Sequence, residues 1–144
     1  MLEINNLSKI RIDKQVFSTV AKKVLSGENR RIENISLAFV DEVEIKKLNK
    51  KFRKKNKPTD VLSFSAQGGP ASGGESEKNY LGEIVICPTV VKENAEKDKI
   101  TFKKELIKVF IHGILHLLGY DHEKSEKGAK EMEEKQNKYL EGKF

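Results

Sequence analysis

The stretch HGILHLLGYDH, residues 112–122, contains all three histidines of this 144-residue chain and is its most informative segment. Residues four apart on a helix are offset by roughly 40° around the axis and about 6 Å along it, so His112 and His116 present their imidazoles on one face. Gly119 is suited to ending that helix, because glycine takes the left-handed C-cap conformation without a steric penalty. His122 can then turn back toward the pair. The spacing predicts a metal site made of three histidines.

Three neutral imidazoles leave the fourth position of a tetrahedral zinc open, which is typical of catalytic rather than structural zinc sites. We therefore expect one zinc ion per chain. Nickel, iron and copper also bind such nitrogen sites, so the sequence does not determine the metal. The competing interpretation is that the histidines are ordinary core residues, as a single histidine on an apolar helix often is. Three histidines at ligand spacing disfavour it.

The helix that carries the first two histidines is expected to lie at the centre of the fold. Thr101 is the predicted N-cap, and the helix runs to Leu118. A helix that is apolar on every side is buried, and histidines on a buried helix are costly unless they are hydrogen-bonded or coordinated. Burial of His112 and His116 thus favours the metal interpretation. The apolar positions of its second half are Leu106, Ile107, Val109, Phe110, Ile111, Ile114, Leu115, Leu117 and Leu118.

The remaining chain alternates between strand and helix patterns, which predicts an α/β (α+β) fold with one mixed sheet of about four strands flanked by helices. We expect a single domain over residues 1–144, with a mobile loop at the glycine-rich segment 66–79. Strands are predicted at Leu2–Asn5, Ile32–Val40, Val61–Ser65 and Leu81–Cys87. Helices are predicted from Ile12 to Gly27, after a capping-box pattern at Asp41 and Glu44, after Pro88, and from Lys124 to Leu140, where Met132, Gln136 and Tyr139 form a packing face.

Composition narrows the class of protein. The net charge of +6 predicts an anionic partner such as a nucleic acid, although the 28 basic residues are spread along the chain and also fit a solvated surface. The lone cysteine, Cys87, excludes an intramolecular disulfide and fits the reducing cytoplasm. No signal peptide is evident, and the longest apolar stretch is too short to cross a bilayer, so we expect no membrane or export role.

The residue between the first two ligands separates two kinds of hydrolysis. Metzincin proteases share this histidine spacing but carry a glutamate general base where this chain has Gly113. Loss of a general base costs on the order of 10²–10⁴-fold in rate, and another carboxylate, for example Glu83, would have to lie near the metal. A metal site can instead act on a phosphodiester. Arg53 fits that chemistry because guanidinium grips phosphate in a bidentate manner, although it also fits a surface residue at a basic helix end.

Four motifs then resemble the YbeY family of bacterial single-strand-specific, metal-dependent endoribonucleases, over about Ile35 to Leu140. They are Asn49-x-x-x-Arg53, the run Lys57-Pro58-Thr59-Asp60-Val61-Leu62-Ser63-Phe64, Leu81-Gly82-Glu83-Ile84, and the histidine window. The resemblance implies a zincin-like fold and a zinc held by His112, His116 and His122. It also implies that Arg53 is required for activity. Ser65, where the family has proline, and the long glycine-rich segment depart from the family pattern.

The resemblance implies a role in ribosomal RNA maturation, notably of the 16S 3′ end, and in ribosome quality control. We expect single-stranded RNA and the ribosome or its proteins as partners, no DNA, and a cytoplasmic location. Arg53 and His116 are the predicted catalytic residues, and the general base is unidentified. Asp121 is expected either to orient an imidazole or to cap the helix end. Two alternatives remain, namely an RNA-binding assembly factor with a structural zinc and, less favoured, a metzincin-like protease.

Overall fold

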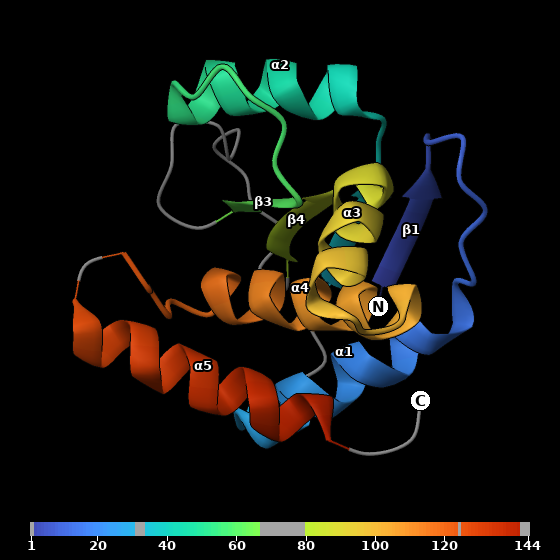
Figure 1. Ribbon diagram of the computed structural model, residues 1–144. Helices are drawn as coiled ribbons and strands as arrows, with labels where there is room; N and C mark the ends of the chain where they lie inside the picture. Colours follow the sequence, from blue (N-terminus) through green and yellow to red (C-terminus); the bar gives the residue numbers. More distant parts are fainter. Residues whose placement is uncertain (1, 31–33, 67–79, 124, 142–144) are drawn as a thin grey trace.

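The computed structural model describes residues 2–30, 34–66, 80–123 and 125–141. Within these ranges the chain forms one sheet with helices on both of its faces (Figure 1). The strands are β1 (Leu2–Asn6), β2 (Asn34–Phe39), β3 (Val61–Ser65) and β4 (Tyr80–Ile86). The helices are α1 (Gln15–Gly27), α2 (Glu42–Arg53), α3 (Pro88–Asp98), α4 (Phe102–Leu117) and α5 (Glu126–Leu140).

The sheet has the order β1-β2-β4-β3, in which β1, β2 and β4 are parallel and β3 is antiparallel to β4. This confirms the predicted mixed sheet of four strands for the described residues. β3 is an edge strand, so one of its sides has no neighbour within the sheet. The β3 edge lies between α2 and α4. Phe64 of β3 contacts Phe52 on α2, whereas Ser63 bonds Gly113 on α4.

Two apolar clusters cover the two faces of the sheet. The larger cluster joins α1, α4 and α5 to the sheet and contains the aromatic contact between Phe17 and Phe110, whose ring centroids are 5.2 Å apart. The smaller cluster lies beneath α2 and includes Ile45 and Leu62, with Phe64 packed against it. Burial of such side chains is the main favourable term in folding. α4 is therefore held against the sheet, which gives its histidines a rigid base.

Several local predictions are confirmed and two are wrong. Thr101 caps α4 by accepting from the Lys104 backbone N–H at 3.1 Å, and Pro88 begins α3. Asp41 is the N-cap of α2 but makes no capping-box bond, because its carboxylate accepts from the backbone N–H of Lys9 at 3.2 Å. Gly27 ends α1 as predicted, but the helix begins at Gln15 rather than at Ile12.

Three predictions fall wholly or partly outside the described residues. They are nearly all of the predicted mobile loop at 66–79, the first residues of the strand predicted from Ile32, and the first residue of the final helix predicted from Lys124. Among the described helices, none has the length and apolar character needed to cross a membrane.

Candidate metal centre

The turn after α4 places the third histidine near the first two. Gly119 has a φ of +105°, and its N–H bonds the His116 carbonyl while the Tyr120 N–H bonds the Leu115 carbonyl. This pair of bonds is the Schellman arrangement that ends a helix with a left-handed residue. Gly119 therefore ends the helix as predicted, and the chain turns back within three residues to reach His122.

The structure brings the three imidazoles close to one another. Their ring centroids are 5.0 Å apart for His112 and His122, 5.9 Å for His116 and His122, and 6.2 Å for His112 and His116. Three imidazoles bound to one zinc at about 2.1 Å have centroids roughly 5 Å apart. No set of three His, Cys, Asp or Glu side chains in the described ranges has the tighter spacing of a formed metal site. The two separations that involve His116 are each about 1 Å wider than the separation between His112 and His122.

Hydrogen bonds leave the ligand nitrogens of α4 available. His116 Nδ1 lies 2.9 Å from the Tyr120 carbonyl oxygen, which can only accept, so Nδ1 carries the proton and Nε2 keeps its lone pair. His112 Nδ1 lies 3.0 Å from Oε1 of Gln136 on α5. This amide oxygen is also an acceptor, so Nδ1 of His112 donates to it and Nε2 is left free. Metal-binding histidines commonly donate their second N–H to such a partner. The chemistry of the donor set therefore fits zinc.

Burial of the two helical histidines differs from the prediction. His112 is partly buried, and this burial lowers its pKa, which favours the neutral imidazole that a metal binds. His116 is exposed, although α4 is otherwise almost surrounded by apolar contacts. The prediction that both histidines would be buried is therefore wrong for His116. The ligand face of α4 opens to solvent, which gives a large substrate access to the site.

Arg53 lies beside the histidines although it is far from them in sequence. It ends α2, and its guanidinium pairs with the carboxylate of Glu123. The hydrogen bond from Arg53 lowers the pKa of Glu123 and keeps it ionised. Oε1 of the same carboxylate is 3.9 Å from Nε2 of His122. Arg53, which is predicted to bind phosphate, is thus separated from the predicted metal ligand His122 by the side chain of Glu123.

Gly113 has a packing role that the sequence pattern did not show. A Cβ at this position would lie 2.9 Å from Cγ2 of Ile84, which is closer than real side chains approach. The position faces Ile84 of β4 rather than open space, so a general-base glutamate there would force Ile84 to shift. Glu83 precedes Ile84 and points to the opposite sheet face, since side chains alternate along a strand. The carboxylate that a protease mechanism would require is therefore not supplied by Glu83.

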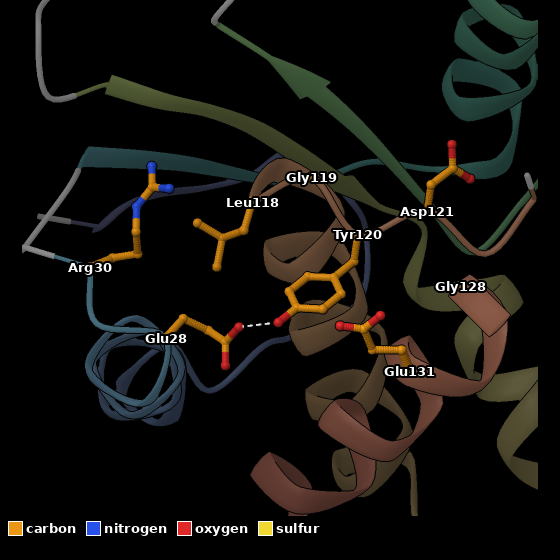
Figure 2. Close-up of a pocket in the computed structure, with 8 residues that line it drawn as sticks. All are labelled: Glu28, Arg30, Leu118, Gly119, Tyr120, Asp121, Gly128 and Glu131. Atoms are coloured by element: carbon orange, nitrogen blue, oxygen red, sulfur yellow. Dashed lines mark hydrogen bonds between the residues drawn. The ribbon is translucent and has the colours of Figure 1, made fainter.

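A pocket of about 450 Å³ lies behind the turn that joins α4 to α5 (Figure 2). Its lining includes Glu28, Tyr120 and Glu131 but neither the histidines nor Arg53. The Glu28 carboxylate accepts from the hydroxyls of Tyr120 and Tyr139 and from Lys135. Because the Tyr120 carbonyl receives His116 Nδ1–H, this carboxylate anchors the ligand turn from behind.

Sequence reasoning missed some supporting residues and left one open. Gln136 was predicted only to pack, and Glu28 and Glu123 were not singled out. Only Gln136 could have been found from the sequence, because it is a polar residue on the apolar side of an otherwise charged helix. The Asp121 carboxylate accepts from the backbone N–H of Glu123 at 2.8 Å, which shapes the turn carrying His122. The orienting bonds of His112 and His116 described above come from other residues.

Comparisons with known proteins show the family of this chain. The family model for Endoribonuclease YbeY matches residues 3–143. Endoribonuclease YbeY of Thermotoga maritima is 49% identical over 108 residues, which cover 75% of this chain and 66% of that protein. The Thermotoga neapolitana protein is 45% identical over 130 residues, covering 89% and 80%. The solution structure of TM1509 from Thermotoga maritima aligns with a TM-score of 0.64 and 40% identity over 98% of this chain and 87% of that one. The chain belongs to the YbeY endoribonuclease family.

Proposed function

We propose that this chain is a metal-dependent endoribonuclease that cuts single-stranded RNA. Its proposed role is maturation of ribosomal RNA, notably the 16S 3′ end, and ribosome quality control in the cytoplasm, with the ribosome or its proteins as partners. Family membership supports the reaction class. The observation that carries the proposal is the convergence of three histidine rings, two of them with Nδ1 already engaged, beside an arginine.

The proposed metal is one zinc ion per chain, held by His112, His116 and His122. Bound there, zinc would supply Lewis-acid polarisation of a phosphoryl oxygen and a water of pKa about 7. Arg53 would bind the phosphate of the scissile bond, because guanidinium offers two parallel donors to two phosphate oxygens. Glu123 now accepts from Nη2 of Arg53, so a phosphate that takes both donors must displace this carboxylate. The exposed ligand face of α4 leaves room for an extended strand.

RNA cleavage by protein stripped of metal and reloaded with zinc tests this proposal. Arg53→Ala should bind zinc normally but lose at least about 100-fold in cleavage rate, as expected when a donor to developing charge is removed. His116→Ala should lose both zinc and activity. Arg11→Ala, an exposed arginine outside the site, serves as the matched control. Normal cleavage by either site variant would contradict that residue's role.

The test also separates the alternatives. Protein that binds zinc stoichiometrically and retains ribosomal RNA, yet leaves single-stranded RNA intact, would indicate an assembly factor with a structural metal. Chelator-sensitive cleavage of an unfolded protein, with RNA untouched, would indicate a protease.

A further inference from the structure

An aromatic ring is exposed beside the candidate active site. Phe52 lies at the end of α2 and keeps 50% of its surface exposed. Its ring contacts Phe64 of β3 in an edge arrangement, with centroids 5.1 Å apart and planes at 68°. Such pairs are stabilising beyond their buried area, so the contact holds the ring in place. Phe52 is thus ordered on one side and open to solvent on the other.

Two chain connections tie this aromatic pair to the catalytic residues. Phe52 immediately precedes Arg53, whose guanidinium reaches Glu123 beside His122. Phe64 immediately follows Ser63, whose hydroxyl donates to the Gly113 carbonyl at 3.3 Å, next to His112. Neighbouring residues of a strand point to opposite faces, so the aromatic pair lies across the β3 edge from the histidines. An extended single strand of RNA that passes over this edge would contact both the aromatic pair and the histidines.

The charges around Phe52 identify the kind of ligand. Lys51 Nζ lies over the Phe52 ring, 5.2 Å from its centroid, so this flexible side chain would share or yield the ring face to a base. Exposed basic residues continue along the chain through Lys57, with no acidic side chain between Lys50 and Lys57. A flat aromatic face among cations is the combination that binds single-stranded nucleic acid, where bases stack on the ring and phosphates meet the charges. An acidic peptide would match the charges but would have no use for the flat ring.

We propose that Phe52, backed by Phe64, is a stacking platform for one unpaired base of the RNA substrate, close to the scissile phosphate held by Arg53. This inference rests on the proposed function and adds to it a base-binding position. It supplies a physical reason for single-strand specificity, because a base inside a duplex has no free face to offer the ring. The competing explanation of Phe52 is that it only completes the apolar side of α2.

Binding of single-stranded RNA by metal-free protein tests the platform without requiring cleavage. Phe52→Leu keeps an apolar side chain against Phe64 but removes the flat ring, and should weaken binding roughly 5- to 150-fold. Phe52→Trp should retain binding. A set of RNAs, each lacking the base at one position, should contain one RNA that binds the wild type as weakly as intact RNA binds Phe52→Leu. Removal of that same base should not weaken RNA binding by Phe52→Leu any further.

Val43→Ala is the matched control, since Val43 is a 68% exposed apolar residue at the other end of the same helix. Equal RNA binding by wild type and Phe52→Leu would overturn the platform. So would a Phe52→Leu defect that no single missing base reproduces, because the ring would then act only by packing. A leucine defect confined to binding of an unfolded protein would assign the surface to a protein partner. If RNA is bound through Phe52 but never cut, the proposed nuclease activity fails while the platform stands.

Discussion

Gln136 and His112 face one another across the contact between α5 and α4, with Oε1 of the glutamine 3.0 Å from Nδ1 of the histidine. Gln136 is only 8% exposed, so this bond lies in a largely dry environment where an unpaired donor is costly. The final helix therefore does more than cover the core, because it sets which nitrogen of His112 is free.

Gln136→Leu should weaken zinc binding about 10- to 100-fold, as is typical when the partner of a metal-binding histidine is removed. Competition with a zinc-binding dye measures the affinity directly. Met132→Leu, a change of similar volume on the same buried face, should leave zinc affinity unchanged. Equal affinities for Gln136→Leu and the wild type would refute the orienting role.

Glu28 should contribute to stability through its three donors. Its side chain is 9% exposed, and Glu28→Gln leaves Tyr120, Tyr139 and Lys135 with a neutral acceptor. We expect a loss of about 1–3 kcal/mol in the free energy of unfolding, measured by urea denaturation. Glu133→Gln, an exposed change on α5, should stay within about 0.5 kcal/mol of the wild type. A Glu28 variant as stable as this control would show that the cluster contributes nothing.

The Glu28 contribution should depend on pH. Burial alone would raise the pKa of Glu28, but the hydrogen bonds from Tyr120, Tyr139 and Lys135 outweigh it and hold the pKa below its ordinary value of 4.5. A lowered pKa stabilises the folded state above pH 4.5, and this stabilisation is lost as the pH falls through the folded-state value. The stability difference between wild type and Glu28→Gln should therefore be largest above pH 4.5 and shrink below it. A constant difference would contradict this linkage.

At alkaline pH, Tyr120 and Tyr139 should make stability depend on pH in the opposite direction. Burial and the bond to Glu28 raise the pKa of Tyr139 above its ordinary value of 10, and the bond to Glu28 raises that of Tyr120 to about 12. A raised pKa stabilises the folded state below pH 10, and this is lost as the pH rises through the folded-state value. Tyr139→Phe should lose less stability than the wild type above pH 10. Ultraviolet titration should show tyrosine ionising late in the folded wild type.

Substitution of Gly113 should destabilise the protein, because the space between α4 and β4 is small at this position. Gly113→Ala gains about 1 kcal/mol in helix propensity but forces Ile84 to move, which costs about 1–3 kcal/mol. We expect a small net loss for alanine. Gly113→Glu, the residue of a metzincin protease, should cost more than about 3 kcal/mol because it places an uncompensated charge against β4. A stable Gly113→Glu protein would show that the α4 contact with the sheet is looser than its distances indicate.

Glu123 should compete with substrate for Arg53. Glu123→Ala frees the guanidinium, and removal of an exposed ion pair changes energies by up to about 1 kcal/mol, so single-stranded RNA should bind up to about fivefold more tightly. Stability should barely change. Glu126→Ala, an exposed acidic residue on α5, controls for the loss of one negative charge. Weaker RNA binding by Glu123→Ala would instead mean that the carboxylate positions Arg53 for phosphate.

Features that depend on neighbouring residues were predictable from the sequence. The N-cap at Thr101, the left-handed Gly119 and the four-residue spacing of His112 and His116 are encoded within one or two helical turns. The capping box at Asp41 failed because its carboxylate bonds Lys9, which is 32 residues away. The burial of His116 failed because hydrophobic periodicity does not say which stripe of a helix the neighbouring elements leave uncovered.

By itself the sequence determined the helix that carries the ligands, its end, the strand and helix order and the kinship with the YbeY endoribonucleases. Local backbone geometry and apolar periodicity suffice for these. Only the tertiary structure decided which groups support the site, because Gln136 and Glu28 reach it from elements far apart in the chain. It also placed Arg53, which the sequence had already singled out, against Glu123 beside His122. Such pairings depend on how α2, α4 and α5 pack around the sheet, and no local pattern records them.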